Sequence, residues 1–438
     1  MKFSKTTAVV AAAVVVASLT LAGCSAGSTS TGSQIAADAK QTINVWGWAG
    51  APGKDVMAGV ISGFEKANPS ITVKFTEIAS LDYKNKATLA LSSKDSIDVV
   101  GVSPSAWAAD NASYLLPVSK WPNGAALVSK YQPQTIDQMK KLFPDDEIRA
   151  VPFGSSGSVV GFYNADLLKK AGLSAPPKTW ADFTKLADSL KGTGIVPAVM
   201  PSDSWFQDEF LTTLVGQTDP SFWNNIRYNN GSFDTKSYID ALAKYKSLYD
   251  TGLFDKSTLD LAYSDAMALF DQGKAAVVFN GSWEAGRLLA SYRAANKVQP
   301  SDVGAMGVPA DSADQVSARS FLDVTYAIPV ASTHQAAAEK FIEYTTAGAG
   351  VDAWASSLGF IPAEKNWKLP SGLLTTDVET SGYATLQTLI GAPSSDRNNL
   401  SNLSAQIGTY ILQVVNGTMT PEAAAKQAEA DHKSGKYN

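Results

Sequence analysis

The residue types that most often carry out catalysis are scarce in this chain. Its 438 residues include only two histidines, His334 and His432, and neither has a cysteine or a second histidine at the spacing of metal ligands. The adjacent acids Asp208 and Glu209 would diverge on a helix, whereas a glycosidase needs two carboxylates opposed across a bond. The sequence contains neither a GxSxG elbow nor a GxxxxGK[ST] loop. We therefore expect no catalytic residue, no metal site and no cofactor.

Tryptophan is the residue type that points to binding. The chain contains ten tryptophans, while charged residues make up only 18% of it. Neutral polar surface and aromatic rings suit a neutral, hydroxyl-rich ligand better than a charged one. The formal net charge is −5, and such a mildly acidic surface argues against nucleic acid as a partner.

Alternating strands and helices must position these residues. Ile43–Trp46, Ile71–Thr76 and Ile97–Val100 are apolar or alternating runs that predict strands, with helical patterns between them. This order predicts an α/β fold with a mostly parallel sheet and helices on both faces. Ligands of such sheets bind beyond the carboxyl ends of the strands, so we expect Trp48 and the loop Ser103–Trp107 at the rim of a cleft.

The run from Val151 to Lys191 joins a glycine-serine crossing, a buried strand and a capped helix. Ser158–Tyr163 is a short apolar run bounded by glycines, which predicts the strand. Thr179, with Asp182 three residues later, forms a capping box for the helix. Trp180 begins the apolar stripe of that helix, so we assign it to packing.

This run resembles the segment YNxDLxKKAGLxxPPxTWxxF of extracellular solute-binding proteins of family 1, the maltose-binding-protein-like proteins that pass sugars to ABC importers. The phrases FxxGKAAxxxNGSW, ending at Trp283, and Gly359–Ala363 (GFIPA) match the same family. The resemblance implies a periplasmic-binding-protein-like type II fold, with two lobes that each hold a β-sheet flanked by helices, a multi-strand hinge and a ligand cleft between the lobes. It places the N-terminal lobe at 41–150 plus 320–368 and the C-terminal lobe at 151–319 plus 369–438.

The resemblance also implies residues that contact a sugar, whose apolar face is covered by aromatic rings and whose hydroxyl edge binds carboxylates, amides and arginines. Trp283 matches the tryptophan that stacks on sugar in the family, with packing as its alternative. Trp205 matches a region that lends an aromatic ring to the cleft, and Asp208 lies one helical turn onward. Asp323 lies near the second crossing between lobes, where family members contact ligand.

Five further candidates have an open alternative. Trp48 and Trp107 lie on predicted rims and could face either ligand or core. Phe153 enters the crossing before the glycine-serine loop and could line the cleft or pack the hinge. Asp396 and Arg397 lie in a carboxyl-terminal loop that could reach the cleft or be solvated.

The amino terminus predicts export. Lys2 and Lys5 precede an uncharged stretch that ends in small residues before Cys24, as in a secretory signal. LAGC resembles a bacterial lipobox, so we expect residues 1–23 to be a signal peptide and Cys24 to be lipidated. Cys24 is the only cysteine, which excludes an internal disulfide. Residues 24–40 then form the lipidated terminus and a flexible tether, and an uncleaved membrane helix is the alternative.

The resemblance as a whole implies the substrate-binding component of an ABC importer. We expect it to be lipid-anchored on the outer face of a bacterial cell membrane, to capture a sugar or short oligosaccharide, and to deliver it to transmembrane permease subunits powered by a separate ATPase. We expect a monomer without enzyme activity. The alternatives are a non-sugar solute such as a peptide, polyamine or metal, and a non-transport adhesion or scaffold lipoprotein.

Overall fold

The computed structural model describes residues 34–36, 38–49, 53–359, 361–391 and 401–436. The predicted signal peptide, the predicted lipidation site Cys24 and the loop residues Asp396 and Arg397 lie outside the described residues. The described residues, all from 34 onward, belong to one compact unit. Among the helices in the described ranges, none is both long enough and apolar enough to span a membrane.

The first sheet has six strands in the order β10-β4-β9-β3-β1-β2. β1 is parallel to β2 and to β3, whereas β9 runs antiparallel to both β3 and β4. Its strands are β1 (Gln41–Trp48), β2 (Ile71–Ile78), β3 (Val99–Val102), β4 (Ala150–Gly157), β9 (Ser320–Ala327) and β10 (Ile361–Pro362). The helices around it are α1 (Lys54–Ala67), α2 (Ser80–Ser93), α3 (Ala106–Asp110), α4 (Gly124–Val128), α5 (Pro133–Lys141), α13 (Gln335–Ala347) and α14 (Val351–Ala355).

The second sheet has four strands in the order β6-β7-β5-β8. Its strands are β5 (Val160–Asn164), β6 (Val196–Val199), β7 (Ala275–Asn280) and β8 (Val303–Met306). Its helices are α6 (Ala165–Lys170), α7 (Trp180–Leu190), α8 (Ser204–Thr218), α9 (Phe222–Tyr228), α10 (Lys236–Asp250), α11 (Tyr263–Asp271), α12 (Ala290–Asn296), α15 (Asp377–Gly391), α16 (Ser401–Val415) and α17 (Pro421–Ser434). The short 3-10 helices are η1 (Ala112–Tyr114), η2 (Val118–Lys120), η3 (Lys256–Thr258), η4 (Ser282–Leu288) and η5 (Ala313–Gln315).

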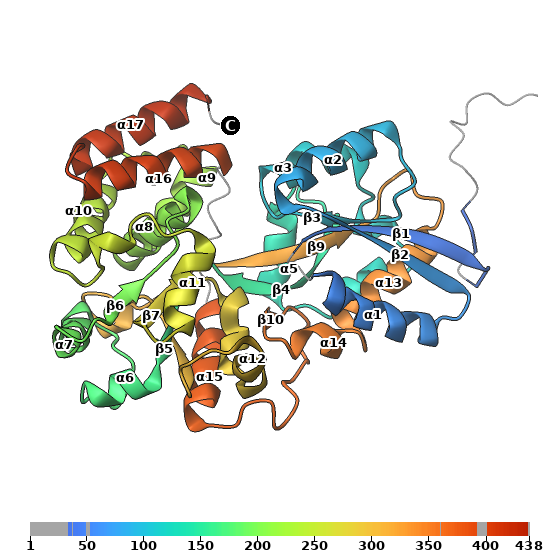
Figure 1. Ribbon diagram of the computed structural model, residues 1–438. Coiled ribbons are helices and arrows are strands. Elements are labelled where there is room, and N and C mark those ends of the chain that lie inside the picture. The colour runs from blue at the N-terminus through green and yellow to red at the C-terminus, as the bar shows by residue number, and fades with distance from the viewer. Residues whose placement is uncertain (1–33, 37, 50–52, 360, 392–400, 437–438) are drawn as a thin grey trace, which may run out of the picture. The chain divides into compact units, whose positions relative to one another are not determined.

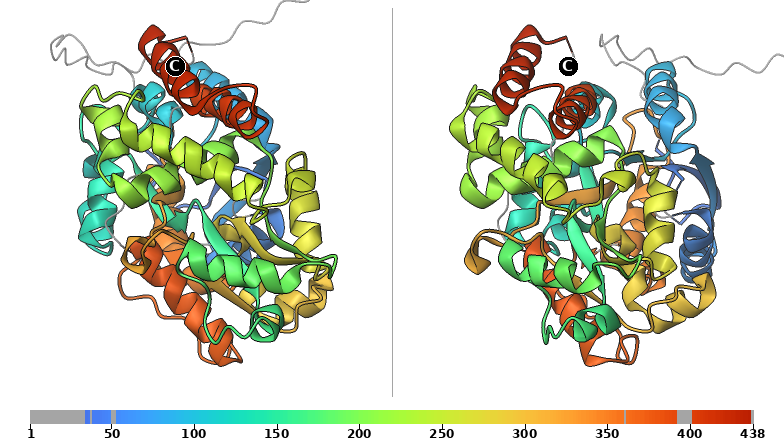
Figure 2. Two further views of the ribbon diagram at one scale, coloured as in Figure 1. Left: turned by 90° about the vertical axis from the view of Figure 1, so that its left-hand side faces the viewer. Right: turned by 60° about the vertical axis from the view of Figure 1, so that its left-hand side comes forward.

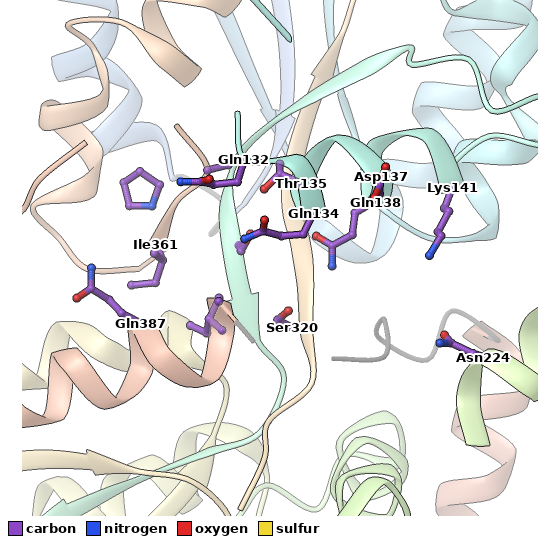
Figure 3. A pocket seen from close by; sticks show the side chains of 15 residues that line it. Gln132, Gln134, Thr135, Asp137, Gln138, Lys141, Asn224, Ser320, Ile361 and Gln387 are labelled. Carbon is purple, nitrogen blue, oxygen red and sulfur yellow. The ribbon is translucent and has the colours of Figure 1, made fainter. Parts of the chain in front are cut away.

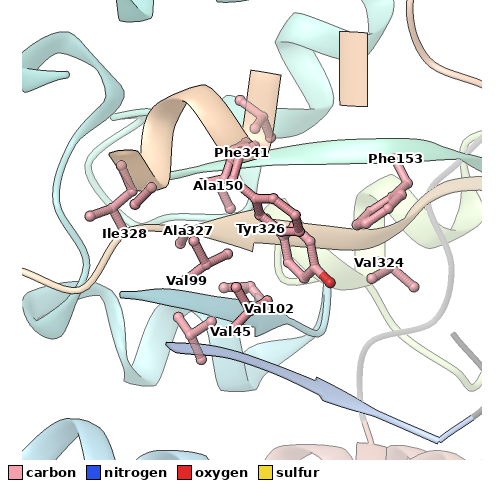
Figure 4. Close-up of a cluster of buried hydrophobic side chains, with 14 of the residues drawn as sticks. Val45, Val99, Val102, Ala150, Phe153, Val324, Tyr326, Ala327, Ile328 and Phe341 are labelled. Carbon is pink, nitrogen blue, oxygen red and sulfur yellow. The ribbon is translucent and has the colours of Figure 1, made fainter. Parts of the chain in front are cut away.

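Each sheet has its own hydrophobic core, and we call each sheet with its helices a lobe. The core of the first lobe is one cluster that joins strand residues such as Val45, Val99 and Tyr326 to Phe341 of α13 (Figure 4). The second sheet has a cluster on each face, because alternate residues of a strand point to opposite sides. α16 and α17 pack on each other and on α10, and α16 also packs on α8 (Figure 2).

The prediction of a mostly parallel sheet is wrong, because both sheets are mixed. β4 leaves the first sheet for the second lobe, and β9 returns from it, so the two strands run side by side in opposite directions (Figure 1). β5 is likewise antiparallel to both of its neighbours, β7 and β8. The passage of the chain between two lobes therefore sets the direction of these strands.

Local sequence signals predicted several element ends correctly. Thr179 caps α7, since its hydroxyl oxygen accepts a hydrogen bond from the backbone N–H of Asp182 at 3.1 Å. The Asp182 carboxylate in turn accepts the Thr179 hydroxyl proton at 2.9 Å. Trp180 is buried in the second lobe, as predicted from the stripe. α6 ends before Gly172, whose φ of +74° is a left-handed conformation that glycine adopts without strain.

Candidate ligand-binding site

One edge of the first sheet carries two of the predicted site residues. Trp46 pairs with Val100 in the parallel strands β1 and β3, so Trp48 lies at the carboxyl end where β3 also ends. Val102 at the end of β3 pairs with Thr325 of β9, and Asp323 lies two residues beyond that point. The register therefore brings Trp48 and Asp323 to the same edge of the sheet, which faces the second lobe (Figure 1).

The paired strands β4 and β9 extend past this edge and have two different faces. Phe321 pairs with Ser156 and Asp323 pairs with Gly154, so these side chains share one face. The Ser156 hydroxyl donates to the Asp323 carboxylate at 2.9 Å. Ser155 belongs to the opposite face. The two faces of this strand pair, which we call the ribbon, therefore carry different side chains.

Trp283 lies on the Phe321 side of the ribbon. It belongs to η4, which follows the end of the buried strand β7, and its ring centroid lies 6.5 Å from that of Phe321 and 6.2 Å from that of Trp205. The hydroxyl of Ser282 accepts the backbone N–H of Gly157 at 3.0 Å and so ties η4 to the end of β4. Three aromatic rings from three separate elements therefore meet beside the ribbon.

The position of the Trp283 ring depends on Gly281. A Cβ built on Gly281 would lie only 2.1 Å from the indole carbons, far inside van der Waals contact. The indole therefore lies directly over the backbone of the residue two positions before it. Only glycine leaves this space, which gives a steric reason for the NG pair at the end of β7.

A polar chain holds the edge of the same ring. The indole Nε1–H of Trp283 donates to the Tyr263 hydroxyl at 2.6 Å, and that hydroxyl donates to the Glu284 carboxylate. Arg287 donates to Glu284 and, through two nitrogens at 2.8 Å each, to Asp271. Burial raises the pKa of Tyr263 well above its ordinary value, and the Glu284 charge raises it further. Burial alone would lower the pKa of Arg287, but the two carboxylates raise it overall, so the arginine stays charged.

Beside Trp283 lies a hollow of about 570 Å³, which we call the Trp283 hollow. α1 and the segment of α14 through Gly359 line it from the first lobe, and η4 and α12 line it from the second. Trp283 and Tyr292 are its aromatic residues, and Glu284 is the one charged residue among the described residues of its lining. Its volume falls in the usual range of ligand sites, about 300–1,000 Å³. Its remaining described lining is Gly53, Val56, Gly286, Leu289, Ser291, Ala295, Asn296, Ala353, Ser356, Ser357 and Gly359.

A second hollow, of about 390 Å³, lies on the opposite face of the ribbon (Figure 3). α5 lines it from the first lobe, α15 and Asn224 line it from the second, and Ser155 and Ser320 contribute from the ribbon. We call it the Gln132 hollow, after one of several carboxamides in its wall. No aromatic ring is found among the described residues that line it. It therefore lacks the flat apolar surface that the Trp283 hollow offers.

The structure brings several predicted residues together. Trp283 and Trp205 are neighbours, and both are half-buried. Asp323 is half-buried on the ribbon face that carries Phe321, next to Trp283. Trp48 is half-buried at the sheet edge, with its ring 5.1 Å from that of Tyr83. These four residues remain candidates for ligand contact.

Three other predicted residues lie in the core. Trp107 is 8% exposed, and its indole N–H donates to the Thr88 hydroxyl of α2 at 2.8 Å. Phe153 is fully buried between Tyr326 and Trp354, so it packs the first lobe (Figure 4). Asp208 is fully buried, and its carboxylate accepts the hydroxyl of Ser404 from α16 at 2.7 Å. The burial of Trp107 and Phe153 favours the core alternative for both. Asp208 lies in a stretch of α8 in which every residue from Phe206 to Val215 is buried.

Four residues at or beside the candidate site, Tyr263, Glu284, Tyr292 and Phe321, were not predicted from the sequence. Phe321 could have been found, because it lies two residues before Asp323 on one strand and alternation places both on one face. Tyr263 precedes Trp283 by 20 residues, and no local pattern links the two. Tyr292 starts no motif, and its place in the hollow depends on how α12 packs.

Comparison with known proteins places this geometry in a family. The family described as "Bacterial extracellular solute-binding protein" matches residues 47–350. The "Multiple sugar-binding protein" of Streptococcus mutans serotype c is 22% identical over 300 residues, 66% of this chain and 67% of that protein. The "sn-glycerol-3-phosphate-binding periplasmic protein UgpB" of Brucella abortus is 28% identical over 178 residues, which cover 37% of this chain and only 38% of that protein.

Solved structures agree on the fold. A structure titled "Chitin oligosaccharide binding protein" superposes with a TM-score of 0.73 at 18% identity, and the match covers 90% of this chain and 98% of that one. The two-sheet α/β architecture is thus the type II periplasmic-binding-protein fold that the family resemblance implied. Since the family match spans well over half of the sequence, the chain belongs to the bacterial extracellular solute-binding proteins.

Proposed function

We propose that this protein captures a neutral sugar or short oligosaccharide outside the cell and delivers it to an ABC permease that a separate ATPase powers. The observation that carries the proposal is the Trp283 hollow, which has a fixed indole, a second aromatic ring and a polar rim. The family supplies the extracellular solute-binding role, and the curated relative with the longest match cited above is named for sugar binding. Trp283 is the proposed contact residue that lines the hollow itself. Trp205, Trp48 and Asp323 lie outside its described lining, and we propose that they contact ligand that extends from the hollow or that the lobes enclose on closure.

The chemistry of the hollow suits a sugar. An indole face covers the C–H face of a pyranose, while hydroxyl and carboxamide groups such as those of Ser357 and Asn296 bond its edge. Asp323 adds a carboxylate on the ribbon, and carboxylates form charge-assisted hydrogen bonds with hydroxyls. A ligand in the hollow would touch both lobes, because α1 and α14 face η4 and α12 across it.

Glycerol phosphate is the second candidate, because relatives from Brucella and Agrobacterium are named for it. A phosphate requires positive charge, and no lysine or arginine occurs among the described residues that line the Trp283 hollow. Arg287 lies behind the lining, and two carboxylates already bind it. The first backbone N–H of α1, that of Lys54, donates to the Glu77 carboxylate at 2.8 Å, so the helix start already holds an acid. The electrostatics therefore favour the neutral ligand.

Capture follows from the two-lobe arrangement. β4 and β9 connect the lobes, and we propose that they form the hinge of a closure around ligand. Only contacts that are stronger in the closed state shift the equilibrium toward it, and ligand that touches both lobes supplies such contacts. The proposed lobes are 41–150 plus 320–368 and 151–319 plus 369–438. The core assignment of Val151 and Phe153 to the first lobe supports a boundary a few residues after 150.

The proposal also covers how the protein is anchored and whether it acts as an enzyme. We propose that residues 1–23 are removed, that Cys24 carries the lipid anchor, and that the mature monomer stays on the outer face of the membrane. Catalysis is not part of the proposed role. Glycoside hydrolysis needs two carboxylates opposed across the bond, one of them free to donate a proton. Glu284 already accepts from Tyr263 and Arg287, and Asp323 already accepts from Ser156.

A thermal-shift panel tests the ligand class. The mature protein from residue 25 would be melted with neutral mono- and oligosaccharides, sn-glycerol 3-phosphate, a polyamine and a short peptide. We expect a rise in melting temperature with at least one neutral sugar, since a ligand that binds only the folded state stabilises it. A shift only with glycerol phosphate, polyamine or peptide would replace the sugar assignment, and no shift with any of them would favour a non-transport lipoprotein.

A further inference from the structure

Trp283 is supported by a network of four side chains, of which only Glu284 is among the described residues that line the Trp283 hollow. Its indole N–H is bonded to Tyr263, which is the first residue of α11. Asp271 is the last residue of the same helix and binds Arg287. Glu284 lies between them and accepts from both Tyr263 and Arg287. The two ends of α11 therefore hold η4 at two places. Tyr263 bonds Trp283 and Glu284, and Asp271 bonds Arg287 about one turn farther along η4.

The direction of each hydrogen bond from Trp283 through Tyr263 to Glu284 is fixed. An indole N–H can only donate, and an ionised carboxylate can only accept. The Tyr263 hydroxyl must therefore accept from Trp283 and donate to Glu284. The side chain of Arg287 is 5% exposed and that of Glu284 is 15% exposed, so their attraction is poorly screened by water. A rotation of the indole about its χ angles would break the first bond of the chain.

Arg287 supports a second ring of the same hollow. Its guanidinium carbon lies 5.6 Å from the centre of the Tyr292 ring, within the range of a cation–π contact. Tyr292 and Trp283 both line the hollow. One buried arginine, held by Asp271 and Glu284, thus connects to both aromatic rings, to one through Glu284 and Tyr263 and to the other directly.

We infer that Tyr263 is a positioning residue that fixes the plane of Trp283 before ligand arrives, through the chain Tyr263–Glu284–Arg287–Asp271. This inference rests on the proposed function, because it explains how the proposed platform is held. A ring held in its bound orientation loses less conformational freedom when ligand binds. Its N–H is also occupied, so Trp283 offers the ligand its face and no hydrogen bond.

The test uses Tyr263→Phe, which keeps the ring and removes only the hydroxyl. Ordering one side chain on binding costs affinity by a factor of roughly 2 to 12, so we expect the dissociation constant for the cognate sugar to rise by a factor in that range. In a Trp283→Phe background, which has no indole N–H, the same change should leave the dissociation constant unaltered. Tyr249→Phe is the matched control, because it removes a buried hydroxyl from α10 outside the hollow.

A second readout needs no sugar. Near-ultraviolet circular dichroism of ligand-free protein reports how rigidly tryptophans are held, and we expect Tyr263→Phe to weaken the tryptophan bands while Tyr249→Phe leaves them unchanged. If Tyr263→Phe does not fold, Glu284→Gln replaces it, since the amide weakens the acceptor of the Tyr263 proton and keeps the side-chain size. Equal losses of affinity in the wild-type and Trp283→Phe backgrounds, or unchanged affinity and unchanged spectrum, would overturn the inference.

The two proposals fail in different ways. If the wild-type protein binds no sugar, the proposed function is wrong, yet the ligand-free spectrum still decides whether Tyr263 holds Trp283. If the wild-type protein binds sugar and Tyr263→Phe matches it in affinity and in spectrum, the function stands and the positioning role is wrong.

Discussion

Replacement of Trp283 by alanine should cost the protein most of its affinity for sugar while leaving it folded. The side chain is half-buried beside Trp205 and Phe321, and its outer face borders the hollow. Alanine removes the stacking platform and leaves the ribbon, the sheets and both cores in place. The change therefore separates ligand contact from folding better than a change at a fully buried tryptophan would.

The expected loss follows from the area that a sugar covers. A tryptophan can bury about 150–250 Å², and a pyranose lying on one face covers about a third of that, ~70 Å², which at ~25 cal/mol per Å² contributes ~2 kcal/mol. This corresponds to a dissociation constant about 30-fold higher. A half-buried ring also contributes less to folding than a core tryptophan, whose loss costs about 3–5 kcal/mol, so we expect the melting temperature to fall by only a few degrees.

Isothermal titration calorimetry with the sugar found in the thermal-shift panel measures this loss. Trp367→Ala is the matched control, because Trp367 is also half-buried and also donates its indole N–H, to Asp352 at 2.8 Å, but does not line the hollow. We expect the control to bind as the wild type does. Wild-type affinity in Trp283→Ala, or an equal loss in both variants, would refute the assignment of Trp283 to the ligand.

Three further predictions concern stability. Arg293→Met leaves Glu379 buried without the ion pair that its carboxylate forms with Arg293 at 2.6 Å, so chemical denaturation should show a loss of stability of about 3–5 kcal/mol. As a control, Lys86→Met in the exposed pair with Asp82 should change the stability by less than about 1 kcal/mol. Similar small losses in both variants would contradict the expected cost of breaking the buried pair. Burial alone would raise the pKa of Glu379. Hydrogen bonds to its carboxylate outweigh burial and lower the pKa below its usual value of 4.5, so the folded state favours the ionised form. The donors are the backbone N–H groups of Thr375 and Thr376 and the side chains of Arg293 and Thr375. The stability that the Glu379 carboxylate contributes is complete above pH 4.5 and is lost as pH falls through the lower pKa of the folded state. The free energy of unfolding, measured between about pH 3 and pH 6, should therefore depend less on pH in Glu379→Gln than in the wild type. An equal pH dependence in both proteins would argue against the depressed pKa. Gly408→Ala places a Cβ 2.0 Å from the Ser204 carbonyl oxygen and should destabilise the protein by about 1–3 kcal/mol at the contact of α16 with α8. Gly216→Ala, which has open space around it in α8, should stabilise the protein by up to about 1 kcal/mol. Melting temperatures that shift in the same direction in both variants would contradict this packing.

Local chemistry made much of the fold predictable. The cap at Thr179, the apolar stripe from Trp180 and the buried strand Ala275–Asn280 depend on neighbours in the sequence, so their patterns are visible without a structure. The direction of β9 is different. It depends on the chain returning from the second lobe, and no residue of Ser320–Ala327 records that path.

The candidate site was predictable only in part. Trp283 follows shortly after the end of the buried strand β7, and residues beyond such strand ends commonly face ligands. Trp48 and Trp107 looked equivalent in the sequence, yet Trp107 bonds Thr88 of α2 while Trp48 stays half-exposed. Tyr263 was not predicted, because it meets its partner Trp283 only when α11 packs beside η4. Contacts between distant segments decide which aromatic rings lie at the candidate site.

The most direct test of the sugar assignment is a crystal structure of the mature protein grown with the sugar that most raises its melting temperature. We predict difference density for a sugar ring lying flat against the face of Trp283, with its hydroxyls toward the ribbon that carries Asp323 and contacts from both lobes. Density for the sugar in the Gln132 hollow, or at another place away from Trp283, would contradict the central claim that this indole is the binding platform.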